Sequence, residues 1–133
     1  IPSGQTSKAI VSSLDVLPTF AGLAGARKHL PENRKLDGVN QSDLWLGKSK
    51  KGARNGFLYY NDGELQAVRE GPWKLRLPGL KKMRHYYKTL DKGSQQTELY
   101  HLEKDPGETN DLAEHEPETV ARLMKIANEA KAR

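Results

Sequence analysis

The sequence of 133 residues has no cysteine, which excludes disulfide frameworks, thiolate metal sites and cysteine nucleophiles. It also has no apolar run near the roughly 18 residues that a membrane-spanning helix needs. Its first residues lack the basic cluster and the unbroken apolar stretch of a signal peptide. We therefore expect no membrane among its partners, and the sequence by itself assigns no cellular compartment.

Apolar residues are scarce for a folded chain of this length. Hydrophobic residues make up 35% of the sequence. The share is about 40% when glycine is added and tyrosine left out, against about 45–50% in typical domains. The core is therefore expected to be thin, either because loops take up much of the chain or because another part of the protein completes its apolar surface. Since the sequence also lacks an initiator methionine, we expect it to be a piece of a longer protein.

The first third of the sequence predicts one helix among loops. Apolar residues over about 13–24 fall at near-helical spacing. Pro18 is tolerated there if the helix begins just before it, because first-turn N–H groups have no intrahelical acceptor. Ser13 or Asp15 is expected to cap this helix. The loop that follows is expected to hold a single helical turn at 42–46.

Four short segments have the composition and alternation of strands, and they lie at 57–60, 65–69, 73–77 and 98–102. In the third segment Trp73, Leu75 and Leu77 fall on one face. Lys74 and Arg76 fall on the other face, so the sheet is expected to have a dry side and a charged side. Turn residues separate the first three segments, which predicts an antiparallel meander.

The last part of the sequence predicts a long amphipathic helix. Pro117 suits the first helical position, and acidic residues fill the first turn. Val120, Leu123, Met124 and Ala127 then recur on one face. The predicted fold class is α+β, a small four-stranded antiparallel sheet with a packed C-terminal helix.

Positive charge is concentrated in one segment. The net charge is +5, from 22 Lys and Arg against 17 Asp and Glu. Residues 74–92 hold seven of those cations and one of the acids, so the rest of the sequence is slightly negative. Tyrosine and histidine within the run would add stacking and hydrogen bonds to an anion contact. The pattern fits either an anion-binding segment or a solvated basic loop. Because no nucleic-acid-binding motif occurs, nucleic acid is not the favoured partner.

The residues alone build no catalytic constellation. The four histidines include no i, i+4 pair and no metal-type spacing. No G-x-S-x-G, P-loop or G-x-G-x-x-G motif occurs. The aspartates beside glycine are explained by turn chemistry, because Asp side chains hydrogen-bond the nearby backbone.

Short fragments along the sequence resemble the C-terminal portion of the arylsulfatase-type sulfatases over roughly residues 10–130. Each fragment is weak alone, and the resemblance depends on their order and gaps. The fragments are LDVLPT at 14–19, LAG at 23–25, LDGV at 36–39, LG at 46–47, AVREGPWKL at 67–75, ELYHL at 98–102, DPGE at 105–108 and NDLA at 110–113.

The resemblance implies a division of the chain. Sulfatases of this type resemble alkaline phosphatase, with a large α/β/α domain followed by a small domain of four antiparallel strands and a long helix. Residues 1–35, with the helix at 13–24, would then be the tail end of the large domain and a linker. Residues 36–133 would be the C-terminal subdomain, in which Trp73, Tyr100 and Leu102 pack between sheet and helix. The parent is expected to be periplasmic, secreted or lysosomal.

The resemblance also implies an activity that this sequence does not carry by itself. The family hydrolyses sulfate esters with a formylglycine made in a Cys/Ser-x-Pro-x-Arg motif, beside a calcium ion held mainly by Asp and Asn. No such motif occurs here, and no position matches the family's metal ligands. We therefore expect a catalytically inert chain without a cofactor of its own. Its main partner would be the missing N-terminal sulfatase domain, and the parent would use calcium and formylglycine.

The basic segment is the candidate for substrate contact. In the family, the connection between the third and fourth strands can reach the rim of the active cleft. The resemblance therefore implies that a sulfated substrate, a polyanionic saccharide rather than a small aryl ester, is contacted by Lys81, Lys82, Arg84, His85 and Tyr86. The alternative is a free-standing basic module that binds an acidic polysaccharide or nucleic acid.

Overall fold

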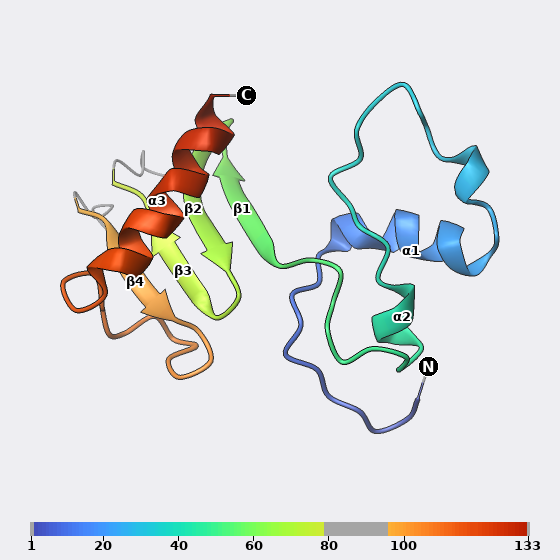
Figure 1. Cartoon of the computed structure of the whole chain (residues 1–133), viewed down its shortest axis with the longest axis horizontal. Helices are drawn as coiled ribbons and strands as arrows, with labels where there is room; N and C mark the ends of the chain where they lie inside the picture. The colour runs from blue at the N-terminus through green and yellow to red at the C-terminus, as the bar shows by residue number, and fades with distance from the viewer. Residues whose placement is uncertain (1, 79–95, 133) are drawn as a thin grey trace. The chain divides into compact units, whose positions relative to one another are not determined.

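The computed structural model describes residues 2–78 and 96–132. The chain divides into two compact units, Ile1–Asn55 and Gly56–Arg133. The first unit is mostly loop around short helices, and the second is a sheet covered by one long helix (Figure 1). Each unit is described by itself below.

The first unit contains α1 (Val16–Leu23) and α2 (Ser42–Trp45), together with two short 3-10 turns. The helix predicted over 13–24 is confirmed, as a 3-10 turn that runs directly into α1. Of the two predicted caps, Asp15 takes part in the capping, whereas Ser12 rather than Ser13 is the N-cap of the 3-10 turn. Ser12 accepts the N–H of Leu14, and the Asp15 side chain reaches back to the N–H of Ser12. This reciprocal arrangement is a capping box, which satisfies donors that a helix start leaves free.

The second unit contains β1 (Gly56–Asn61), β2 (Glu64–Glu70), β3 (Trp73–Arg76), β4 (Glu98–His101) and α3 (Pro117–Lys131). All neighbouring strands pair antiparallel in the order β1-β2-β3-β4, which confirms the predicted meander. The β1–β2 turn places Asp62 and Gly63 at positive φ angles of 49° and 78°. Two consecutive positive φ angles suit a two-residue hairpin, because they match the twist of the flanking strands.

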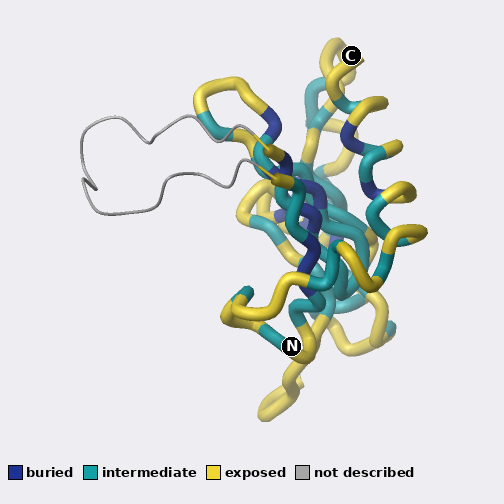
Figure 2. The backbone as a smooth tube through the Cα atoms, turned by 90° about the vertical axis from the view of Figure 1, so that its left-hand side faces the viewer, coloured by how far each residue is buried: buried dark blue, intermediate teal, exposed yellow. Residues whose placement is uncertain are grey.

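The hydrophobic core of the second unit lies between the sheet and α3. Leu75 and Leu99 pair across β3 and β4, and Leu123 of α3 packs against the same cluster. All three side chains are fully buried. Figure 2 colours the buried stretches of the backbone dark blue. The alternation predicted for β3 is confirmed, since Leu75 and Leu77 are buried in this core and Trp73 packs against it.

The prediction for β4 was wrong about which residues face α3. Tyr100 and Leu102 were expected between the sheet and the helix, but Leu99 occupies that position. Tyr100 is buried as well, but it pairs with Lys74 on the opposite face. The segment ELYHL allows two strand phases, since it has apolar residues at both odd and even positions. Pairing with β3 decides between them, because a one-residue slip would turn every side chain of β4 to the other face.

The segment after β4 covers the outer edge of that strand. Leu112 donates its N–H to the carbonyl of Leu99 at 2.8 Å, and the carboxylate of Asp111 accepts the N–H of Leu99 at 2.9 Å. These bonds occupy edge groups that would otherwise be open to another strand. Among the described residues, the helices are all too short or too polar to cross a membrane.

Candidate functional site

The five residues predicted to contact substrate lie between 79 and 95, outside the described residues. The described structure reaches both ends of this connection, at β3 and at β4. The prediction for Lys81, Lys82, Arg84, His85 and Tyr86 therefore stays a prediction.

The last residue of β3 and the first residue of β4 form an ion pair. Arg76 and Glu98 are cross-strand partners, and their Nη1 and Oε2 atoms lie 2.9 Å apart. The Tyr100 hydroxyl donates to the same Glu98 oxygen at 3.0 Å. Burial, followed by the bond and charge of Glu98, raises the pKa of Tyr100. The cluster keeps the Tyr100 phenol protonated and the ends of β3 and β4 together.

A second cation of the same face is also paired. Lys74 Nζ lies 2.5 Å from Glu108 Oε1 and 5.1 Å from the centre of the Tyr59 ring. Glu108 has a positive φ of 53°, which is uncommon for a residue that carries a side chain. The two cations that β3 contributes to the basic run are thus neutralised within the sheet. Neither Lys74 nor Arg76 is therefore left unpaired for an external anion.

The first unit is built around a buried carboxylate. Asp15 is fully buried and accepts hydrogen bonds from the backbone N–H groups of Ser12 and Val39 and from the side chain of Gln41. Arg54 adds two more, from Nε at 3.1 Å and from Nη2, and forms an ion pair with it. Five donors from four residues therefore converge on one carboxylate, and these residues lie in three separate segments of the first 55 residues.

The electrostatics of Asp15 follow from these donors. Burial alone would raise the pKa of the carboxyl, because it penalises the charged form. The hydrogen bonds from Arg54, Val39, Ser12 and Gln41 outweigh burial and hold the pKa far below its ordinary value of 3.8. The ion pair also raises the pKa of Arg54. We call this cluster of Asp15, Gln41 and Arg54 the Asp15 joint, because its ion pair and hydrogen bonds hold separate segments of the first unit together.

Neighbouring residues complete this joint. Gln41 is also buried, and its backbone N–H donates to the Thr19 hydroxyl while its side-chain oxygen accepts from Ala53. A Cβ at Gly38 would lie 1.9 Å from the Leu14 carbonyl oxygen, so only glycine allows this approach. The fragments at 14–19 and 36–39, which carried the resemblance in the sequence, are therefore held together in space.

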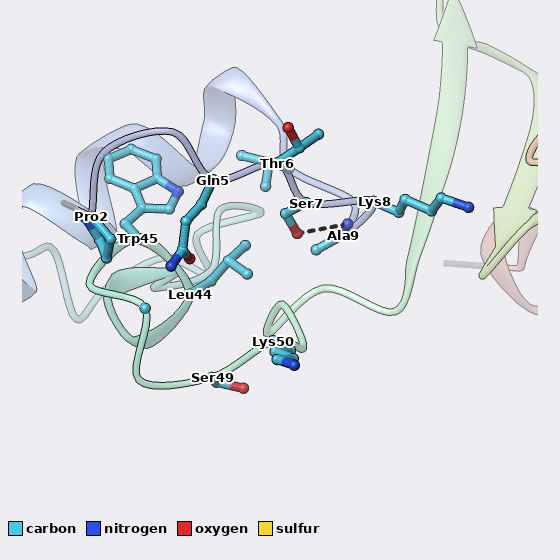
Figure 3. A pocket seen from close by; sticks show the side chains of 12 residues that line it. Pro2, Gln5, Thr6, Ser7, Lys8, Ala9, Leu44, Trp45, Ser49 and Lys50 are labelled. Carbon is cyan, nitrogen blue, oxygen red and sulfur yellow. Dashed lines mark hydrogen bonds between the residues drawn. The ribbon is translucent and has the colours of Figure 1, made fainter.

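An open hollow of about 1020 Å³ lies in the first unit between the opening residues and α2. In Figure 3, Pro2, Gln5 and Trp45 gather at one end of it, whereas Lys8 points away from them. The residues that line it include Lys8 and Lys50 but no acid and no histidine. Its lining therefore offers neither an acid–base pair nor a set of metal ligands.

The described residues hold no group of three or more Asp, Glu or His placed to bind a metal ion. The features that the described residues do present are paired cations on one sheet face, the buried Asp15 carboxylate with its donors, and exposed apolar side chains on α1.

Comparison with known proteins identifies the family. The model described as the C-terminal region of aryl-sulfatase matches residues 52–133. Arylsulfatase G of Rattus norvegicus is 34% identical over 95% of this chain and 25% of its own length. An N-acetylgalactosamine-6-O-sulfatase of Bacteroides thetaiotaomicron is 28% identical over 95% of this chain and 24% of its own length. The chain thus spans about a quarter of the relatives it matches.

Solved structures agree in fold. A structure described under the metabolism of multiple glycosaminoglycans by Bacteroides thetaiotaomicron matches 96% of this chain and 26% of its own, with a TM-score of 0.76 and 27% identity. The PsFucS1 sulfatase from Pseudoalteromonas sp. matches 99% of this chain and 27% of its own, with a TM-score of 0.78 and 21% identity. The chain therefore belongs to the arylsulfatase-type sulfatase family, and it corresponds to the C-terminal region of that family.

Proposed function

We propose that this chain acts as the C-terminal part of a sulfuric ester hydrolase and is inert by itself. The observation that carries the proposal is the family match over residues 52–133, in a chain that spans a quarter of its relatives. The remainder of the enzyme would supply the formylglycine and the calcium ion, since the sequence has no Cys/Ser-x-Pro-x-Arg motif. A free-standing basic module is not favoured, because the likeness to sulfatases extends over 95% of the chain.

The substrate class that we favour is a sulfated saccharide. One relative is named as an N-acetylgalactosamine-6-O-sulfatase, and one structural neighbour is described under glycosaminoglycan metabolism. The sequence places five cations between residues 81 and 92, in the connection from β3 to β4. Cations at a cleft raise the local concentration of a polyanion and its rate of association. We therefore propose that substrate is contacted by Lys81, Lys82, Arg84, His85 and Tyr86.

Charge reversal tests this assignment in the full-length enzyme. Changing Lys81, Lys82 and Arg84 together to Glu should raise the KM for a polysulfated saccharide about tenfold or more, because electrostatic attraction is replaced by repulsion. The KM for a small aryl sulfate and the kcat for both substrates should stay unchanged. Steady-state kinetics at low and moderate salt measure these values, and added salt should shrink the difference.

The matched control reverses three exposed lysines of the first unit, Lys28, Lys35 and Lys48, which changes the net charge by the same amount. If this control raises the saccharide KM as much, overall charge rather than the segment sets the affinity. An unchanged saccharide KM in the segment variant would remove these residues from the substrate contact.

The partner that we propose for the first unit is the catalytic domain of the same enzyme. Large apolar side chains of α1 and of the residues just before it are exposed. Exposed fractions of 40–57% apply to Val11, Leu14, Val16, Leu17, Phe20 and Leu23. A helix that exposes large apolar residues to water on successive turns marks an interaction surface. These residues lie within 1–35, the part that we propose to be the edge of the large domain.

Replacing two of these side chains tests that surface. Leu14→Ser with Leu17→Ser should weaken association with the separately produced catalytic domain tenfold or more, measured by sedimentation velocity. The stability of the chain itself should change by about 0.5 kcal/mol or less per site, as for exposed positions. Lys28→Ser with Lys35→Ser, also exposed, should leave association unchanged. Equal association for both double variants would show that the apolar face of α1 is not the contact.

A further inference from the structure

A hollow of about 580 Å³ lies beside Trp73 in the second unit. We call it the Trp73 hollow, and its polar lining consists of His101, Lys104, Asp105, Thr109, Asn110 and Glu116. The volume falls within the range of about 300–1,000 Å³ that is usual for small-molecule sites. None of these residues takes part in the ion pairs of the opposite sheet face or in the Asp15 joint.

One wall of the Trp73 hollow is aromatic and contains an unsatisfied polar atom. The rings of Trp73 and His101 meet edge to face, with centroids 4.7 Å apart and planes at 76°. Nδ1 of His101 is buried, and no hydrogen-bond partner for it lies among the described residues. Buried polar atoms are nearly always paired, so this nitrogen is a polar group that the described residues leave unsatisfied beside the hollow.

The opposite wall is held rigid before any ligand arrives. The Asp105 carboxylate accepts the N–H groups of Thr109 at 2.7 Å and Asn110 at 2.8 Å, and the Thr109 hydroxyl at 3.0 Å. These bonds, with that of Asn110 first, lower the pKa of Asp105. Lys104 donates its N–H to the His101 carbonyl at 3.0 Å, which ties the loop to β4. A preformed wall avoids the ordering cost that binding otherwise incurs.

The charges of the Trp73 hollow select against an anion. Lys104 faces Asp105 and Glu116, so the formal charge of the lining is −1. The Asp105 oxygens are already occupied by the loop. The groups left to bind a ligand are an indole, an imidazole, an amide, a hydroxyl, one ammonium and one carboxylate. This mixture of donors and acceptors beside an aromatic ring matches a ligand with apolar ring C–H groups and many hydroxyls.

We propose that the Trp73 hollow binds an uncharged sugar residue of a saccharide chain. The sugar ring would lie against Trp73 and beside the imidazole ring of His101. Asn110 and Lys104 would bind further hydroxyls from the loop side. The proposal goes beyond ester hydrolysis, because binding here requires neither a sulfate group nor its release.

Tryptophan fluorescence tests the proposal in the 133-residue chain. The chain has two tryptophans, so Trp45→Phe leaves Trp73 as the only reporter. Titration with the methyl glycosides of glucose, galactose, mannose and N-acetylgalactosamine should give a saturable change with at least one of them. A dissociation constant on the order of millimolar is expected for so small a ligand. Inorganic sulfate at the same concentrations should give no change.

Two variants and their matched controls locate the binding. Asn110→Ala and His101→Phe should each weaken binding about fivefold or more, whereas the exposed Asn128→Ala and His115→Phe should not. Thermal unfolding checks that each variant is folded. Saturation by sulfate alone, by none of the four sugars, or equally in variants and controls would overturn the proposal. Because no readout depends on sulfate release, these outcomes are separate from failure of the proposed function.

Discussion

Replacing Asp15 with alanine is expected to destabilise the first unit by about 3–5 kcal/mol, the cost of breaking a buried ion pair by removing one partner. The large value follows from the number of groups left behind. Arg54 would remain without its main counter-charge, and the N–H groups of Ser12 and Val39 would lose their acceptor. The side chain of Gln41 would lose one of its bonds as well.

Trp45 reports on this unit when Trp73 is changed to Phe, so its fluorescence during denaturant unfolding measures the loss. The matched control is Asp43→Ala, which removes an exposed carboxylate of α2 and should cost about 0.5 kcal/mol or less. If the two alanine variants unfold at similar denaturant concentrations, the buried cluster does not hold the first unit together.

The pH dependence of the first unit follows from the same carboxylate. A carboxyl with a lowered pKa in the folded state contributes stability that is present above its unfolded value, near 3.8. That stability is lost as the pH falls towards the pKa that Asp15 has in the folded state. Protonation then removes the negative charge that Arg54 and the other donors stabilise. Unfolding monitored at Trp45 should therefore become easier below about pH 4. Asp15→Asn should remove this part of the slope, and an unaltered slope would contradict the assignment.

Leu99→Ala is expected to destabilise the second unit by about 2–5 kcal/mol, through lost burial and the cavity left behind. Leu99 is fully buried in one cluster with Leu75 and Leu123, where the close packing of sheet and helix leaves little room to relax. The helical circular dichroism signal during denaturant unfolding measures the change, because α3 packs on this cluster.

Leu102→Ala is the matched control, since it makes the same change just after the same strand. Leu102 is only half-buried and lies outside the core cluster, so its replacement should cost clearly less. Should Leu102→Ala cost as much as Leu99→Ala, the phase of β4 described here would be wrong.

Sequence patterns were sufficient where neighbouring residues decide the structure. The alternation of Trp73, Leu75 and Leu77 identified β3 and its buried face, and the spacing of Val120 and Leu123 identified α3. The sequence pattern did not predict the buried face of β4, because its five-residue segment has apolar residues at both odd and even positions. Only its pairing with β3 selects the phase, and that pairing is a contact between distant residues.

The Asp15 joint could be anticipated only in part. Asp15 is recognisable as a residue near a helix start, but its remaining donors come from Val39, Gln41 and Arg54. These lie 24 to 39 residues further along the chain. Arg54 stands in a glycine-containing loop with no periodic pattern, so nothing local marks it as a partner. The fragments at 14–19 and 36–39 both carry the resemblance in the sequence. In the structure they contact each other, through the bond from Val39 to Asp15 and the close approach of Gly38 to Leu14.

The charge and the position of the basic run could be predicted, but its ion pairs could not. The sequence shows a positively charged segment between two strands. It does not show that Glu108 neutralises Lys74 or that Glu98 neutralises Arg76. Both pairs join residues brought together by strand pairing or by the turn after β4. The sequence therefore overestimates the free positive charge of the basic run by these two residues.

Sulfate release tests the central claim most directly. An aryl sulfate would be incubated with the catalytic domain of the full-length enzyme, with this chain, and with both together. We predict no release above background by this chain alone, and greater release by the two together than by the catalytic domain alone. Release by this chain alone, or a catalytic domain that is equally active without it, would contradict the claim that these residues complete a sulfatase without performing its chemistry.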